Sequence, residues 1–134
     1  MAQLKGWKRA ARYLGAMSAS PVDLAFLERF CQGDRSRMAK YIRLYLAEAP
    51  AIFAELHQAA DRQNAAQVAA TAHNLRPMMH QMGAQRLMDL LTTLEERVKE
   101  EEVSAISLLV QDVVRMSTDV EAELRSALDQ LSAT

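Results

Sequence analysis

The chain has few of the residues that interrupt helices, glycine and proline, and a single cysteine. Its 134 residues include only four glycines and three prolines. Residues that favour helices, such as alanine, leucine, glutamate and arginine, are plentiful, so we expect few strands or none. The single cysteine, Cys31, excludes an internal disulfide and a cysteine-based metal cluster within the chain. These shortages predict an all-α protein and fit a reducing compartment, so we expect a cytoplasmic location.

A strong excess of one charge and long apolar runs are also missing. The formal net charge of -1 gives no global electrostatic reason to bind nucleic acid. No apolar run approaches the roughly 18 residues that a membrane-spanning helix needs. Half of the residues are hydrophobic and a quarter are charged, as in an ordinary globular protein. A disordered chain would have a much lower hydrophobic share. A chain of 134 residues then fits one domain with a single core.

The N-terminal segment, residues 1–20, differs from the chain that follows. It carries four basic side chains around Trp7, namely Lys5, Lys8, Arg9 and Arg12. We expect an arm outside the core, with residues 21–134 forming the folded domain. The arm could lie on a membrane surface or a partner as a short basic amphipathic helix. A packing extension or a terminal remnant without function is the alternative that the sequence leaves open.

Helical periodicity begins after this arm. Asp23 can cap a short helix that ends at Gly33, and Asp34 can cap a long helix with one apolar stripe. Pro50 lies inside the long helix, where it removes one backbone hydrogen bond and should bend the axis without breaking it.

Three further amphipathic helices follow. Asn64 can cap the first of them, whose apolar seam has alternating gaps of four and three: Val68, Ala72, Leu75, Met79 and Met82. A leucine-rich helix follows Gly83, and the last helix carries apolar residues from Ile106 to Leu131. Such stripes can be buried only against one another, and short connections favour antiparallel neighbours. The prediction is an up-and-down antiparallel four-helix bundle with a short additional N-terminal helix.

His73 is the first candidate for chemistry. Ala72 and Leu75 belong to the seam, so His73, about 100° further round the helix, should point outward. Arg76 and His80 follow on the same flank. A neutral imidazole can attack a phosphoryl group, and a nearby cation can offset the negative charge that arrives with it. On spacing alone, however, a histidine near an arginine usually marks only a solvated helix face.

A longer pattern surrounds this histidine. The chain reads Thr71-Ala72-His73-Asn74-Leu75-Arg76, then Met82-Gly83-Ala84, and then Leu87 and Leu94-Glu95. These residues resemble the signature of histidine-containing phosphotransfer (Hpt) domains, which act in multistep two-component relays. The resemblance extends over roughly residues 23–128 and includes the turn at Gly33-Asp34 and the proline at Pro50.

The resemblance implies a role for three side chains. His73 would be phosphorylated on the ring nitrogen that faces solvent. Arg76 stands where the family usually has lysine, and would stabilise the charge of the phosphoryl group. Glu95 stands where the family often has a polar side chain that hydrogen-bonds the other ring nitrogen and orients the ring. The alternative for Glu95 is an exposed charge paired with Lys99.

Two more residues could contact a partner. Pro77 stands where the family usually has glycine, and it removes the backbone donor to the His73 carbonyl, at a cost of up to about 3 kcal/mol. We interpret Pro77 as part of a docking surface for a particular partner, the alternative being a tolerated kink. His80 could contact the receiver or the phosphate, although a surface histidine without a special role is commoner.

The resemblance implies a histidine phosphotransfer protein of a multistep two-component phosphorelay. His73 would accept and donate a phosphoryl group to and from receiver-domain aspartates. The chain would be a stoichiometric phosphocarrier without kinase activity, a monomer, and a partner of a response regulator receiver domain, a hybrid histidine kinase or both. We expect no intrinsic cofactor, with Mg²⁺ in the receiver. The alternative is a non-catalytic helical adaptor that binds a receiver domain or kinase.

Overall fold

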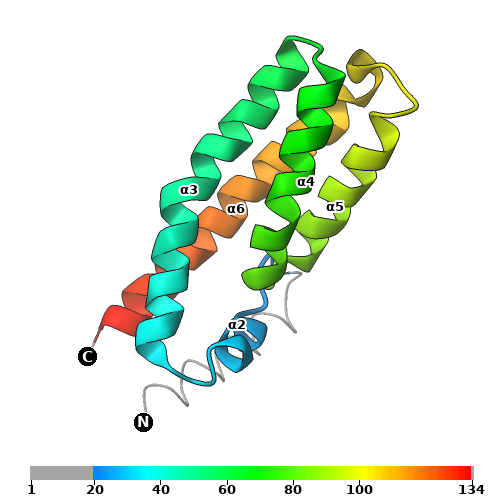
Figure 1. The fold of residues 1–134 in the computed structure, drawn as a ribbon. Helices are drawn as coiled ribbons and strands as arrows, with labels where there is room; N and C mark the ends of the chain where they lie inside the picture. Colours follow the sequence, from blue (N-terminus) through cyan, green and yellow to red (C-terminus); the bar gives the residue numbers. More distant parts are fainter. Residues whose placement is uncertain (1–19, 134) are drawn as a thin grey trace.

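The computed structural model describes residues 20–133, and this part of the chain is helical without strands (Figure 1). The elements are α2 (Leu24–Phe30), α3 (Arg35–Asp61), α4 (Ala65–Gln81), α5 (Gln85–Arg97), the 3₁₀ helix η1 (Val103–Ile106) and α6 (Ser107–Ser132). The predicted all-α class, with one short helix before four long ones, is confirmed. The N-terminal arm predicted for residues 1–20 lies outside the described residues except for Ser20.

Local hydrogen bonds explain where three of the helices begin. The side-chain oxygen of each capping residue accepts a hydrogen bond of 3.1 Å from the backbone N–H three positions on; the capping residues are Asp23, Asp34 and Asn64. All three had been predicted as caps. Pro50 and Pro77 both lie inside helices that continue beyond them, so neither proline breaks its helix.

The four long helices form an up-and-down bundle. α3 packs against α4 and α6, and α5 packs against the same two helices. Figure 1 shows short turns between α3 and α4 and between α4 and α5, while a longer connection that contains η1 leads to α6. The predicted seam of α4 is buried in full: Val68, Ala72, Leu75, Met79 and Met82. The outer face of α4 is therefore left for the site.

The short helix α2 lies at the end of the bundle, beside the C-terminal end of α4 (Figure 1). Its Leu24 and Leu27 are buried in the common core. The backbone N–H of Asp23 donates a hydrogen bond of 2.9 Å to the Gly83 carbonyl, in the turn after α4. These contacts fix α2 next to the last turn of the helix that carries His73.

Candidate functional site

His73 lies near the middle of α4 and points away from the core. Its neighbours Ala72 and Leu75 are fully buried, whereas 67% of the His73 side chain is exposed. The prediction that this ring faces outward is confirmed. An imidazole in this position is open to a second protein.

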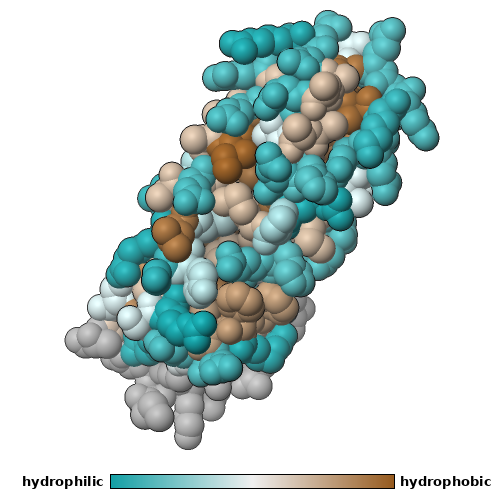
Figure 2. All heavy atoms as spheres, viewed as in Figure 1, coloured by the Kyte–Doolittle hydropathy of each residue, from teal (hydrophilic) through white to brown (hydrophobic). Residues whose placement is uncertain are grey.

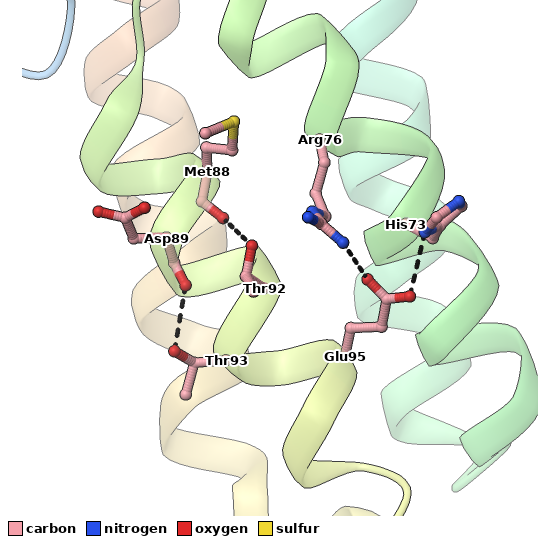
Figure 3. A network of polar contacts seen from close by, with 7 residues as sticks. All are labelled: His73, Arg76, Met88, Asp89, Thr92, Thr93 and Glu95. Carbon is pink, nitrogen blue, oxygen red and sulfur yellow. Dashed lines mark hydrogen bonds and ion pairs between the residues drawn. The ribbon is translucent and has the colours of Figure 1, made fainter.

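A carboxylate of the neighbouring helix joins His73 to Arg76 (Figure 3). Glu95 of α5 follows the buried Leu94 and is turned toward α4. Its Oε1 lies 3.0 Å from His73 Nδ1, and its Oε2 accepts a hydrogen bond of 2.9 Å from Arg76 Nη1. Only 15% of the Glu95 side chain is exposed. The structure thus brings together His73, Arg76 and Glu95.

The charge on Glu95 follows from these contacts. Partial burial raises the pKa of the Glu95 carboxyl, but the hydrogen bond from Arg76, the nearby charges of His73 and Arg76 and the hydrogen bond with His73 together lower it more. The pKa of Glu95 therefore lies below its usual value, and the group is an ionised acceptor at neutral pH. A neutral His73 ring beside such an acceptor carries its proton on Nδ1, which leaves the lone pair on Nε2.

Arg76 is held against the protein and does not extend freely into solvent. Its side chain is 37% exposed, and its Nη1 is bonded to Glu95. Its Nε is buried and has no hydrogen-bond partner among the described residues. The guanidinium therefore stands one helical turn from His73 with its orientation set by the protein around it.

Pro77 and His80 are exposed on the same helix, beyond His73. The His80 ring packs edge-on against Phe26 of α2, with ring centroids 5.4 Å apart. Phe30, also on α2, is 44% exposed and packs in the same edge-on manner against Tyr41 of α3, at 5.6 Å. Figure 2 shows apolar side chains gathered at the surface where the end of α4 meets α2.

The aromatic contacts of α2 had not been predicted. The sequence indicated a short helix from Asp23, but local periodicity does not tell which surface such a helix will cover. The position of α2 depends on the backbone bond between Asp23 and Gly83, two residues 60 positions apart. A signal in the sequence was Gly83 itself, since a turn glycine often marks a close approach of two backbones.

A cavity of about 240 Å³ lies away from His73, near the turn between α3 and α4. Its lining includes His57, Gln63, Ser104 and Gln111 but not His73. Within residues 20–133, no cluster of three or more histidine, cysteine or acidic side chains is arranged to bind a metal ion. Among the helices described, none combines the length and apolarity of a membrane crossing.

Comparison with known proteins adds one match. The family model for the Hpt domain matches residues 40–134, a span that contains His73, Arg76 and Glu95 and covers more than half of the chain. No curated protein and no solved structure matches the chain.

Proposed function

We propose that this chain, which belongs to the Hpt domain family, holds a phosphoryl group on Nε2 of His73 and exchanges it with receiver-domain aspartates. Hpt domains carry out histidine phosphotransfer in phosphorelays, and they are phosphocarriers rather than kinases. The observation that supports this assignment best is an exposed His73 ring whose Nδ1 contacts an ionised carboxylate.

In this transfer the chain supplies the nucleophile and the receiver supplies the phosphoryl group. His73 Nε2 attacks the phosphorus of an aspartyl phosphate on the receiver, a new N–P bond forms, and the P–O bond to the aspartate breaks. The aspartate leaves as a carboxylate, and the proton stays on Nδ1 of His73. Positive charge develops on the ring during the attack, and the Glu95 carboxylate, 3.0 Å away, stabilises that charge. Transfer to the next receiver is the reverse reaction.

Arg76 would offset the charge of the bound phosphoryl group. A guanidinium has five N–H donors, so the contact of Nη1 with Glu95 leaves donors for a phosphoryl oxygen. The cation stands on the same helix, one turn beyond His73. The planar guanidinium can donate to two acceptors in a fixed geometry, whereas a lysine ammonium is a compact charge without this directional preference.

The partner would dock over the outer face of α4. Hpt domains bind response regulator receiver domains or kinases, and we assign the contact surface to Pro77 and His80 together with the exposed aromatic side of α2.

Mg²⁺ would be supplied by the receiver, and the chain would need no cofactor of its own. We also propose that the chain acts as a monomer in the cytoplasm.

The test is a transfer experiment with the purified chain. A receiver labelled with ³²P on its aspartate is mixed with the chain and Mg²⁺, and the chain is examined for label that is acid-labile and base-stable. His73→Gln should abolish the label, whereas His57→Gln, which changes an exposed histidine of α3, should retain it. Label that persists in His73→Gln would remove His73 from this role. Absence of label with every cognate partner would favour the adaptor function.

A further inference from the structure

We infer that the basic N-terminal arm of this chain docks on one flank of α6. This surface, called the acidic flank below, consists of five residues on one side of the helix: Leu109, Asp112, Met116, Asp119 and Glu123. The occupant is thus a segment of the same chain, held by opposite charge and by apolar contact. The inference goes beyond phosphotransfer and does not depend on it.

The arm is attached to the bundle beside α6. The hydroxyl of Ser20, the first described residue, lies 2.5 Å from a carboxylate oxygen of Glu123, within hydrogen-bond distance. The two residues are 103 positions apart, so their contact fixes the place where the arm leaves the domain. Val22, two residues further on, is buried in the core. A segment attached at this point has a high effective concentration near α6, so individually weak contacts suffice to dock it.

The arm and the domain have opposite charge. Residues 1–19 contain four basic side chains and no acidic one, whereas the rest of the chain contains 12 basic and 17 acidic side chains, a net charge of -5. On the acidic flank, Asp112 and Asp119 are exposed and Glu123 is half-buried. Asp112 is paired with Arg115 at 2.9 Å, but the part of the chain that the structure describes supplies no ion pair for Asp119. The flank therefore has negative charge that a basic segment can neutralise.

Apolar side chains share this line along α6 with the carboxylates. The five residues follow gaps of three, four, three and four, the spacing that keeps positions on one side of a helix. Leu109 and Met116 are half-buried. Leu108, four positions before Asp112, is 73% exposed, the largest exposed fraction among the large apolar side chains described. The flank therefore offers apolar surface as well as negative charge.

The arm has the complementary pattern. Its apolar residues recur at gaps of three, four and three, the spacing of an amphipathic helix: Leu4, Trp7, Ala11 and Leu14. A basic residue directly follows each of the first three: Lys5, Lys8 and Arg12. At about 1.5 Å per residue, a helix from Leu4 to Leu14 would be about 15 Å long, and the flank from Leu109 to Glu123 is about 21 Å long. The arm is therefore short enough to lie along the flank.

An arm on α6 leaves the phosphoacceptor face of the bundle open. α4 and α6 each pack against α3 and α5, so they lie at opposite corners of the bundle, and Figure 1 shows α6 behind α4. A docked arm therefore does not cover His73. An anionic membrane surface would engage the same cations of the arm that the flank binds, so the experiment has to separate these two occupations.

Trp7 is the reporter, because it is the one tryptophan of the chain. In the full chain, docking should shift the Trp7 emission to shorter wavelength and reduce its quenching by acrylamide, relative to the chain unfolded in urea. The shift should be independent of protein concentration, because the contact lies within one chain. NaCl at about 1 M, which shortens the Debye length to about 3 Å, should remove part of the shift.

Reversal of charge on the flank should release the arm. Asp119→Lys combined with Glu123→Lys should lower the ratio of docked to free arm by about tenfold, the order expected for two exposed ion pairs, and move the Trp7 emission toward that of the unfolded chain. The matched control reverses two exposed carboxylates near the C-terminal end of α5, Glu96→Lys with Glu100→Lys. It has the same net charge and should leave the emission unchanged. Far-ultraviolet circular dichroism verifies that each variant is folded.

A charge swap shows whether the arm and the flank are in direct contact. Lys8→Glu combined with Arg12→Glu should release the arm in the otherwise unchanged chain. Together with the two reversals on the flank, the same pair should restore docking, because opposite charges face one another again. A purely structural effect of the flank reversals would not be rescued by a change in the arm.

Three results would overturn the inference. One is Trp7 emission at low salt that equals the emission of the unfolded chain. Another is a shift that the reversals on the flank do not reduce, which would place the arm elsewhere. The last is a shift that appears only at high protein concentration or only with phosphatidylglycerol vesicles, which would assign the arm to a second copy or to a membrane. None of these results involves a receiver, so they leave phosphotransfer on His73 untouched.

Discussion

Gly83 and Asp23 are joined backbone to backbone at the end of the bundle. The Asp23 N–H donates to the Gly83 carbonyl at 2.9 Å. Gly83 has a φ of +69°, and a Cβ built at this position would lie only 2.6 Å from the Asp23 carbonyl oxygen. This close approach fixes α2 against the end of α4, where Phe26 meets His80. The apolar side of the candidate docking surface therefore depends on a glycine in the turn.

Replacement of Gly83 by alanine should destabilise the protein markedly. The positive φ of this position is unfavourable for alanine, and the added Cβ would clash with the Asp23 carbonyl oxygen, which cannot move without shifting α2. We therefore expect the free energy of unfolding to fall by about 2 kcal/mol or more. Gly33→Ala is the matched control, because Gly33 has a similar φ of +75° but no atom within 4 Å of its Cβ position. Urea unfolding of both variants measures the difference, and equal losses would contradict the role of the close approach.

The helices themselves could be predicted because their signals are local. Asp34 and Asn64 bond to backbone groups three residues away, and the seam from Val68 to Met82 repeats along one face of one helix. The outward direction of His73 follows from that same seam. Caps and periodicity need no knowledge of distant residues, so a single sequence contains them.

The contacts between helices could not be derived in this way. Glu95 has Lys99 four residues on, and local spacing alone gave no reason to prefer His73, 22 positions away, as a partner. Only the resemblance to Hpt domains suggested that contact. Neither source indicated that Arg76 bonds to Glu95, because the rotation of α4 against α5 decides which oxygen its guanidinium reaches. The roles of these residues in phosphotransfer stay predictions.

Loss of the Glu95 carboxylate should slow phosphorylation of His73. Glu95→Ala removes the acceptor at Nδ1, so the ring loses both its preferred tautomer and the stabilisation of the charge that develops on it. We expect the rate of transfer from a phosphorylated receiver to fall by about tenfold or more. Glu96→Ala removes an exposed carboxylate of the same helix and serves as the control. Rapid-quench measurement of the labelled chain gives both rates, and similar rates would argue against a role for Glu95.

Acid should remove a part of the stability that Glu95 provides. The folded protein lowers the pKa of Glu95 below its usual value of 4.5, so the unfolded chain binds a proton at a higher pH than the folded one does. The stabilisation is therefore present above about pH 4.5 and lost as the pH falls through the lower, folded-state value. Glu95→Gln lacks this titration, so the difference in unfolding free energy between wild type and variant should shrink from pH 6 to pH 3.

The control for this pH dependence is Glu101, whose pKa is also lowered, through a hydrogen bond from Arg97. The side chains of Arg97 and Glu101 are 42% and 40% exposed, compared with 15% for Glu95, so water and salt screen their ion pair more strongly. Glu101→Gln should leave the acid profile close to that of the wild type. A profile for Glu95→Gln that runs parallel to the wild type over this range would count against the proposed contribution of Glu95.

We expect Pro77 to lower the free energy of unfolding and also to influence the choice of partner. Pro50, which lies inside α3, serves as the control that separates these two effects. Alanine at position 77 restores a backbone N–H that can bond to the His73 carbonyl, so Pro77→Ala should raise the free energy of unfolding by about 1–3 kcal/mol. Pro50→Ala makes the same change inside α3 and should also raise it. Pro77 is exposed one turn beyond His73, so only its replacement should change the rate of transfer from a receiver. Equal transfer rates for both variants would show that Pro77 is merely a tolerated kink.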